Sequence, residues 1–469
     1  MVRRRNRKVN ARCGPLFWGV MFAATAAALA ASARGQDDLV PLIVELLGDK
    51  DKDVRSLAFE QVRTQAKGEA ATRKFAELLP TLQPETQVGL LSALATRGDR
   101  GAAPAVRTLL TGSQDESVRL AAITALGFLG DAGDMGVLVK HLSSGKDAEQ
   151  KAARASLVRL PGEAASAALV AQMQHAPAAQ RIALIEILTE RRTGQNELLV
   201  AAVNDDPQIR SAAMSALGRI AAPEHIAAMV PGVLKAQPGS ERAAAERAVA
   251  AVCHRIAEAG DRAKLLLATM DKLDAKNRRE LMPTLGRVGG PAALASAEEA
   301  YRDADPAMHA AGLAALCNWP DGSVVARLLE LARTEEHPEH RTMARRALIR
   351  MAPLEDARTD ARRLDLLRTL IAMCPDEKEQ NQVLERAKSV RTVETLRFIS
   401  PYLEKPPFAQ QACLTVVELA HHSGLREPHK AEFHAALDKV IATSQNATVV
   451  DRAQRYKKGQ TWVRPKPSS

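Results

Sequence analysis

Residues 115–130 read DESVRLAAITALGFLG, and the same order of residue types returns at 206–220 as DPQIRSAAMSALGRI. It returns again, less sharply, at 305–316 as DPAMHAAGLAAL. A short cassette that recurs along a chain is typical of stacked helical units, each of which packs only on its neighbours. The sequence therefore predicts an open array of helices rather than a closed domain with one pocket.

The residue types within one cassette indicate a helix and its two ends. Asp115 and Asp206 precede the apolar run, where an aspartate caps a helix, and Pro207 follows as the first helical residue. We expect Gly127 and Gly130 to end the helix in a left-handed turn. The positions that recur at helical spacing form one buried stripe: Val118, Ala121, Ala122, Ala125, Leu126 and Leu129.

The rest of the chain has the same texture. A chain of 469 residues would ordinarily hold about three domains, yet alanine, leucine, glycine and proline are spread evenly from the forties to the four-forties. The segment before each cassette is leucine-rich, as in LVPLIVELL at 39–47, so each unit is expected to hold two antiparallel helices. No stretch alternates with the period of a strand. The predicted fold is all-α.

The cassette resembles the HEAT repeat, especially the short repeat of phycobilisome-lyase-type HEAT proteins. The matching residues are the acid, Val118-Arg119, the paired alanines and Ala125-Leu126-Gly127. The resemblance implies a right-handed α-solenoid whose second helices line a concave surface, with Arg119 and Arg210 paired to acids such as Asp115 and Asp206 of neighbouring units. Alignment on the arginine gives a period of about 30 to 36 residues, through Arg55, Gln87, Arg119, Lys151, Arg181, Arg210, Arg242, Arg278, His309 and Arg341.

The resemblance divides the chain. It covers 37–350, and weaker helical texture at 351–450 predicts diverged repeats that end in a cap with a polar outer face. Residues 451–469 are expected to form a basic, flexible tail. Within that tail Trp462 is expected to pack on the last repeat, and the alternative is a peptide that docks on an anionic surface or a partner.

Residues 1–33 resemble a bacterial secretory signal. A basic stretch through Arg12 precedes an apolar run, and the run ends at Ala31-Ser32-Ala33, a small-x-small cleavage site. We expect export, with cleavage before Arg34, to the periplasm or outside the cell. The alternative is an uncleaved anchor in the inner membrane, because the apolar run approaches the roughly 20 residues that span a bilayer.

The positive charge lies at the chain ends. Lys and Arg number 65 and Asp and Glu 55, a net charge of +10, but seven basic residues lie in 1–34 and six follow Asp451. The body at 35–451 therefore carries 52 basic and 55 acidic side chains. Nucleic-acid binding needs a basic stripe along the binding face, so we expect no nucleic-acid partner.

Two histidine clusters are the candidates for metal binding. Residues 335–340 read EEHPEH, and His337 and His340 with nearby carboxylates are ligands that zinc or iron accepts. Because Pro338 starts the next helix, we expect this segment to be a solvated loop. His421 and His422, with His429 and His434 nearby, have no standard zinc spacing. The sequence predicts no metal ligand, no cofactor and no catalytic residue, and leaves metal binding by the two clusters open.

The four cysteines beyond the signal are expected to be buried small hydrophobes, since their spacings form no Cys-x-x-Cys pair: Cys253, Cys317, Cys374 and Cys413. Deoxyhypusine hydroxylase, a HEAT-repeat enzyme, binds iron through His-Glu dipeptides, and this chain has none. Phycobilin lyases share the short repeat but act on cytoplasmic subunits, which conflicts with an export signal. Nucleophile-elbow, Walker-type and dinucleotide-binding motifs are also absent from the sequence.

These observations predict an exported HEAT-repeat scaffold that binds a protein partner along an extended concave helical surface. A small-molecule ligand is not expected. Two alternatives stay open: a lyase or metal-dependent enzyme built on the array, and a non-catalytic accessory subunit of an exported enzyme.

Overall fold

The computed structural model describes residues 36–144 and 146–462, and within these ranges it holds helices and turns but no strand. The predicted all-α repeat fold is confirmed. The predicted signal at 1–33 lies outside the described residues. None of the helices in the described ranges is both long enough and apolar enough to cross a membrane.

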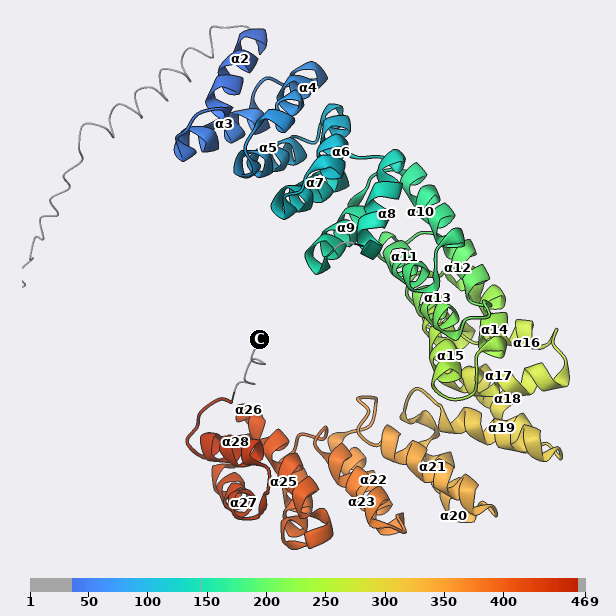
Figure 1. Cartoon of the computed structure of the whole chain (residues 1–469). Coiled ribbons are helices and arrows are strands. Elements are labelled where there is room, and N and C mark those ends of the chain that lie inside the picture. The colour runs from blue at the N-terminus through green and yellow to red at the C-terminus, as the bar shows by residue number, and fades with distance from the viewer. Residues whose placement is uncertain (1–35, 145, 463–469) are drawn as a thin grey trace, which may run out of the picture. The chain divides into compact units, whose positions relative to one another are not determined.

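The chain forms two compact units, one up to Ala216 and one from Leu217 onward, which we call the N-terminal unit and the C-terminal unit. The N-terminal unit is built of helix pairs, and Figure 1 shows its second helices side by side along one edge, with the first helices along the other. Its first helices are α2 (Gln36–Leu47), α4 (Glu69–Glu77), α6 (Ala103–Gly112), α8 (Met135–Ser144), α10 (Glu163–His175) and α12 (Gln195–Ala201). Its second helices are α3 (Lys52–Thr64), α5 (Pro84–Arg97), α7 (Glu116–Leu129), α9 (Asp147–Arg159) and α11 (Ala178–Arg191), and the unit boundary falls within α13 (Pro207–Ile220).

The C-terminal unit continues the same alternation of first and second helices. Its first helices are α14 (Ile226–Lys235), α16 (Lys264–Met270), α18 (Pro291–Tyr301), α20 (Val325–Thr334), α22 (Asp360–Met373) and α24 (Val393–Ile399). Its second helices are α15 (Ser240–Cys253), α17 (Ala275–Val288), α19 (Pro306–Cys317), α21 (Pro338–Met351), α23 (Glu377–Ala387) and α25 (Pro406–His421). The short α26 (Ser423–Arg426) then leads to α27 (Lys430–Thr443) and α28 (Ala447–Lys457), which both pack on α25.

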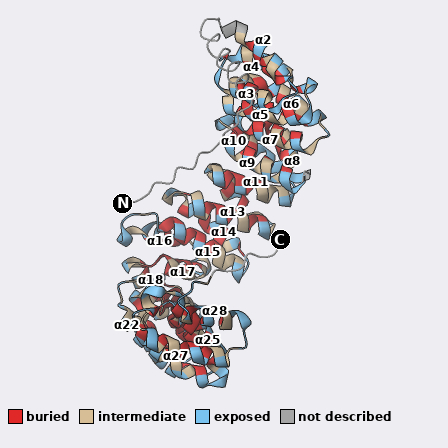
Figure 2. Cartoon of the chain, turned by 90° about the vertical axis from the view of Figure 1, so that its left-hand side faces the viewer, coloured by how far each residue is buried: buried red, intermediate tan, exposed pale blue. Residues whose placement is uncertain are grey.

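The cassette residues do what their types predict at the start of each second helix. The Asp115 carboxylate accepts the backbone N–H groups of Ser117 and Val118, and Asp305 caps α19 ahead of Pro306. The residue seven positions after each member of the arginine register packs between neighbouring helices. Figure 2 shows buried residues gathered there. These residues are fully buried: Val62, Leu94, Leu126, Leu188, Leu217, Val249, Leu285, Leu316 and Leu348. Truncation of such a leucine to alanine typically costs about 2–5 kcal/mol.

The same register corrects one member of the predicted series. In α9 the fully buried leucine is Leu157, so the residue seven positions earlier is Gln150 rather than Lys151. The helix cap agrees, because Lys146 caps α9 and lies four residues before Gln150, as Asp115 lies four before Arg119.

The expected left-handed turn at Gly127 and Gly130 is wrong. Gly127 lies inside α7, and Gly130 has a φ of −74°. The glycines are needed for close packing instead: a Cβ on Gly127 would lie 2.8 Å from the Ser156 Cα of the next repeat. Gly286 is tighter, since a Cβ there would lie 2.0 Å from the Ala315 carbonyl oxygen. In this array the glycine sets the distance between neighbouring second helices.

Arginines in the last turn of several second helices join consecutive repeats, which the sequence did not predict. Arg97 Nη1 donates to the Val62 carbonyl oxygen at 2.9 Å, and Arg350 Nη2 donates to that of Trp319 at 2.8 Å. Arg191 donates in the same way to carbonyl oxygens at the end of α9. Burial at this place lowers the pKa of Arg191. Each guanidinium satisfies carbonyls that the C-terminus of the preceding second helix leaves unpaired.

The structure extends the packed array past the boundary expected at residue 451. Helix α28 runs through it to Lys457, so residues 451–457 do not belong to a flexible tail. Tyr456 is only 1% exposed, and the Arg452 guanidinium lies 4.9 Å from the Trp462 ring centre. Both aromatic side chains of the predicted tail therefore belong to the last helix pair or its edge, and residues 463–469 lie outside the described residues.

Candidate functional site

Where the register holds an arginine, as at Arg119 and Arg210, that side chain closes the end of its own first helix. Arg119 Nη1 donates to the carbonyl oxygens of Ser113 and Gln114 at 3.3 and 2.8 Å. Arg210 donates to Asn204 and Asp205 at 2.8 and 2.9 Å in the same manner. These carbonyls follow the last turn of a helix and have no partner within it. The repeated arginine is therefore a structural residue.

The acid that pairs with Arg119 differs from the one expected. Asp115 is engaged at its own helix: hydrogen bonds from the Ser117 side chain and from the Val118 and Ser117 backbone hold its pKa below the usual range. Arg119 instead forms an ion pair with Glu149 of the next second helix, at 2.8 Å from Nη2 to Oε1. His141 Nδ1 lies 3.0 Å from the other oxygen of Glu149. We call Glu149, Arg119 and His141 the arginine node.

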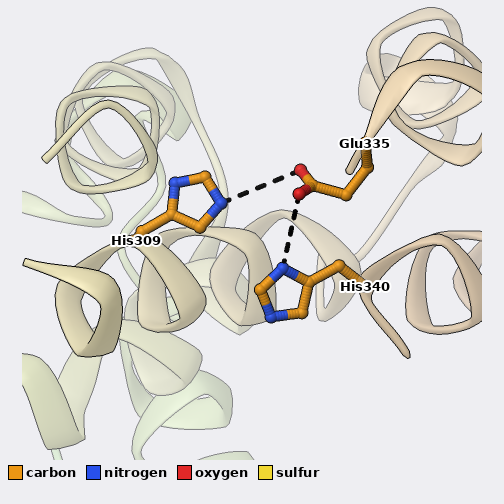
Figure 3. Close-up of side chains that lie close together, drawn as sticks. All are labelled: His309, Glu335 and His340. Atoms are coloured by element: carbon orange, nitrogen blue, oxygen red, sulfur yellow. Dashed lines mark ion pairs between the residues drawn. The ribbon is translucent and has the colours of Figure 1, made fainter. Parts of the chain in front are cut away.

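The C-terminal unit places a histidine at the arginine register, His309 in the first turn of α19. Its Nε2 lies 3.8 Å from Glu335 Oε2, and Nδ1 of His340 lies 3.6 Å from Glu335 Oε1 (Figure 3). The ligand atoms of the three side chains lie within 4.8 Å of one another, and no other such group of three occurs in the described ranges. We call these three residues the histidine node.

Four helix ends position the histidine node. His309 and His340 lie in the first turns of α19 and α21, and Glu335 follows the last turn of α20. Tyr301 ends α18, and its hydroxyl donates to Glu335 Oε2 at 2.5 Å. The Arg327 guanidinium lies 5.2 Å from the Tyr301 ring centre and fixes the ring by a cation–π contact.

The electrostatics of the node keep Glu335 ionised. Burial tends to raise its pKa, but the Tyr301 hydroxyl, the His337 backbone N–H and the two histidines together hold that pKa below the ordinary value. Burial and the Glu335 carboxylate raise the pKa of Tyr301 to about 12, so its hydroxyl stays protonated and donates. The node thus presents a carboxylate between two imidazoles at neutral pH.

The prediction that residues 335–340 form a solvated segment is correct for Glu336, His337 and Glu339, which are exposed, and wrong for Glu335 and His340. The side chains of Glu335 and His340 are 5% and 14% exposed, because the segment packs against α18 and α19. A hollow of about 460 Å³ lies beside the node. His337 lines this hollow, and its ring centre lies 5.0 Å from that of His340. Sequence reasoning missed His309, although its departure from the arginine register was a visible signal.

Comparison with known proteins agrees with this repeat geometry. The family model for HEAT repeats matches residues 72–158. Residues 72–158 are thus identified as HEAT repeats, and the other described helix pairs repeat the same pattern. No curated protein sequence matches it.

Solved structures with similarity to this HEAT array have low sequence identity. Kap121p bound to Pho4p is 12% identical over 90% of this chain and 57% of its own, with a TM-score of 0.43. The CpcE and CpcF complex of phycocyanin lyase from Nostoc sp. PCC7120 is 18% identical over 50% and 94%, with a TM-score of 0.26. Human deoxyhypusine hydroxylase is 21% identical over 62% and 99%, with a TM-score of 0.25. The chain thus spans little more than half the length of Kap121p.

The second histidine cluster of the HEAT array serves packing. His421 Nδ1 lies 2.9 Å from the Tyr456 hydroxyl, and the His421 and His422 ring centres are 5.6 Å apart. Burial, together with nearby positive charge, lowers the pKa of His422. His429 caps α27, and these histidines form no group of three ligands within the described ranges. The cluster joins α28 to the preceding pair.

The cysteines of the HEAT array are buried, as predicted, and no disulfide joins them. Burial raises the pKa of Cys253 and Cys317 to about 12, and that of Cys374 and Cys413 to about 11. These thiols are therefore protonated at neutral pH and act as small apolar side chains.

Proposed function

We propose that this HEAT-repeat chain is an exported scaffold that binds a protein partner along its second helices and acts by binding rather than catalysis. The observation that carries the proposal is the placement of exposed apolar side chains on those helices. Seven large apolar side chains are exposed in the described ranges. Four lie on second helices and are 38% to 44% exposed: Leu57, Phe128, Met343 and Leu414. The other three lie on first helices: Leu42, Leu265 and Val200, which is 73% exposed.

These four side chains share one helix face. Counted from the helix cap, Leu57 and Met343 are the sixth residue, Leu414 is the ninth and Phe128 is the thirteenth. Spacings of three and seven residues bring side chains to the same side of a helix. An exposed apolar side chain that becomes buried against a partner contributes up to about 1.5–3 kcal/mol. Such residues therefore supply contacts from several separate repeats.

The repeated residues of the cassette are already used within the array. Asp115 caps a helix, Arg119 closes another and joins Glu149, and Gly127 allows close packing. Partner recognition therefore falls to side chains that differ between repeats, such as Phe128 under the Arg159 guanidinium at 4.1 Å. Extended recognition of this kind suits a solenoid, whose repeats expose one long surface.

Site-specific photo-crosslinking in the native host tests the binding surface. A photoreactive phenylalanine analogue is placed at Leu57, Phe128 or Met343, and in matched controls at Leu42 or Leu265, which are similarly exposed on first helices. We expect one covalent adduct of discrete mass from the second-helix positions and none from the first-helix positions. Adducts from the first-helix positions alone would assign binding to the opposite layer and contradict the proposal.

The export part of the proposal rests on the basic and apolar pattern of residues 1–33. Cell fractionation followed by N-terminal sequencing tests it. We expect the chain in the periplasm with Arg34 at its N-terminus, or in the inner membrane with its N-terminus intact if the segment is an anchor. Recovery of the full chain from the cytoplasm would contradict export and leave the binding surface to be judged by crosslinking.

A further inference from the structure

We propose that His309, Glu335 and His340 form a binding site for Zn²⁺ with an open coordination position. The proposal is independent of export and of the protein partner. It rests on the spacing of the three side chains, on the groups that orient them, and on their contrast with the arginine node.

The distances within the histidine node suit a bridging metal ion better than hydrogen bonds. The carboxylate oxygens of Glu335 lie 3.6 and 3.8 Å from the two imidazole nitrogens, beyond the usual limit of about 3.2 Å for N–H···O hydrogen bonds. Zinc binds nitrogen and oxygen ligands at about 2.0–2.2 Å, so tetrahedral ligand atoms lie about 3.4 Å apart. Small movements of three side chains would complete the geometry.

One atom of the node lacks a partner. Nδ1 of His340 is buried and forms no hydrogen bond. A buried polar atom without a partner is energetically unfavourable. A metal ion bound at this nitrogen would provide a partner, and Figure 3 shows the nitrogen facing the Glu335 carboxylate, which His309 also faces.

Groups around the node orient the carboxylate as outer ligands of metal sites do. The Tyr301 hydroxyl donates to Glu335 Oε2 and leaves Oε1 toward His340. Arg327 lies over the Tyr301 ring and pairs with Glu298 at 2.9 Å. Such hydrogen-bonded partners of ligating carboxylates typically change metal affinity 10–100-fold when they are lost.

The arginine node shows why the histidine node has this capacity. In both nodes a buried carboxylate meets the residue at the arginine register of the preceding repeat and one further side chain, an imidazole. Arg119 and His141 contact Glu149 at 2.8 and 3.0 Å, so both oxygens of that carboxylate are already in close contact. An arginine has no lone pair to give a metal, whereas a neutral histidine does. The histidine node therefore offers three ligand side chains to a cation, and the arginine node offers two.

The donor set selects the class of ion. Calcium and magnesium prefer oxygen ligands alone, while two imidazoles and one carboxylate suit zinc. Three protein ligands leave the fourth position to water or to a group from a ligand or partner. The hollow beside the node is about 460 Å³ and is also lined by Asp303, Glu336 and His337, so that position is reachable from outside.

Metal titration of the purified full-length chain, freed of metal by chelation, tests the site. We expect one Zn²⁺ per chain by calorimetry, and visible absorption bands when Co²⁺ takes its place. The His309→Arg and His340→Ala variants should bind Zn²⁺ at least 100-fold more weakly and lose the Co²⁺ bands. His141→Ala is the matched control, because it removes an imidazole from the arginine node, and its Zn²⁺ affinity should equal that of the unmodified chain.

The His309→Arg variant is expected to fold, since arginine stands at this register in neighbouring repeats, and its thermal unfolding confirms that. Glu335→Gln provides a second variant of nearly the same size. Equal Zn²⁺ affinity in the unmodified chain and in a folded His309→Arg chain would overturn the proposal. Tight binding of Fe²⁺ without binding of Zn²⁺ would overturn the choice of metal.

Discussion

Glu149 in the N-terminal unit and Glu335 in the C-terminal unit are buried carboxylates with related neighbours and different contacts. Glu149 is 5% exposed and meets Arg119 and His141 at 2.8 and 3.0 Å. Glu335 is equally buried but meets His309 and His340 at 3.8 and 3.6 Å. The nodes differ at the arginine register, and their other two members lie on exchanged helices. Glu149 is in a second helix and His141 in a first helix, whereas Glu335 follows a first helix and His340 is in a second helix.

The two nodes differ because arginine and histidine leave a buried carboxylate in different states. A guanidinium is always charged and donates in a fixed fork, so it satisfies both a carboxylate and nearby carbonyls. An imidazole is shorter and can be neutral, so it leaves the carboxylate partly unsatisfied. The arginine node therefore serves stability, and the histidine node is the departure on which a site can be built.

The largest effect is expected from removal of the carboxylate in the arginine node. Glu149→Ala should lower the free energy of unfolding by about 3–5 kcal/mol, because it leaves the Arg119 charge without its buried partner. Glu335→Ala should lower it by only about 1–3 kcal/mol, through the orphaned Tyr301 hydroxyl. Urea denaturation followed by circular dichroism measures both. Equal losses would show that the two nodes contribute alike to stability.

The helix contacts beneath the nodes come next. Gly127→Ala would bring a Cβ to 2.8 Å from Ser156 Cα, and Gly312→Ala to 2.3 Å from the Tyr301 backbone nitrogen. Each substitution should push packed helices apart and lower the free energy of unfolding by about 1–3 kcal/mol. The loss is measured as a fall in melting temperature. Gly136→Ala is the control, because nothing lies within 4 Å of its added Cβ, and it should stabilise α8 by less than about 1 kcal/mol. An unchanged melting temperature in Gly312→Ala would contradict the close packing beneath the histidine node.

A smaller effect is expected from pH. Burial tends to raise the pKa of Glu149, but hydrogen bonds and charge from Arg119 and His141 hold it below its ordinary value. A lowered folded-state pKa contributes stability above the unfolded pKa of about 4.3, and that stability is lost as pH falls through the folded pKa. Urea midpoints measured from pH 7 down to 3 should fall less steeply in Glu149→Gln than in the unmodified chain. Parallel curves would mean that Glu149 does not titrate in this window.

The smallest effect is expected from the substitution that turns one node into the other. His309→Arg should change the free energy of unfolding by less than about 1 kcal/mol in metal-free buffer, since the arginine can pair with Glu335 as Arg119 pairs with Glu149. Added Zn²⁺ should raise the melting temperature of the unmodified chain and leave that of His309→Arg unchanged, because only binding to the folded state stabilises it. If Zn²⁺ raised the melting temperature of both chains equally, the stabilising Zn²⁺ would be bound somewhere other than the histidine node.

Much of the fold could be predicted because its signals are local. The Asp115 cap, the position of Pro306 and the buried Leu126 all follow from spacing within one helix. The expected turn at Gly127 was wrong, because Gly127 is required for close packing against Ser156 of another repeat. The pairing of Arg119 with Glu149 was missed for the same reason: the partner lies in the next second helix.

The candidate site shows the same division. The sequence by itself determined that this is an all-helical HEAT array, that arginine recurs at one register and that His309 interrupts it. The tertiary structure alone decided that His309 meets Glu335 and His340, and that Glu335 is buried against Tyr301. Helical periodicity and capping depend on residues within a few positions of one another. A ligand set drawn from several helices depends on how consecutive repeats pack, and only the folded array brings those residues together.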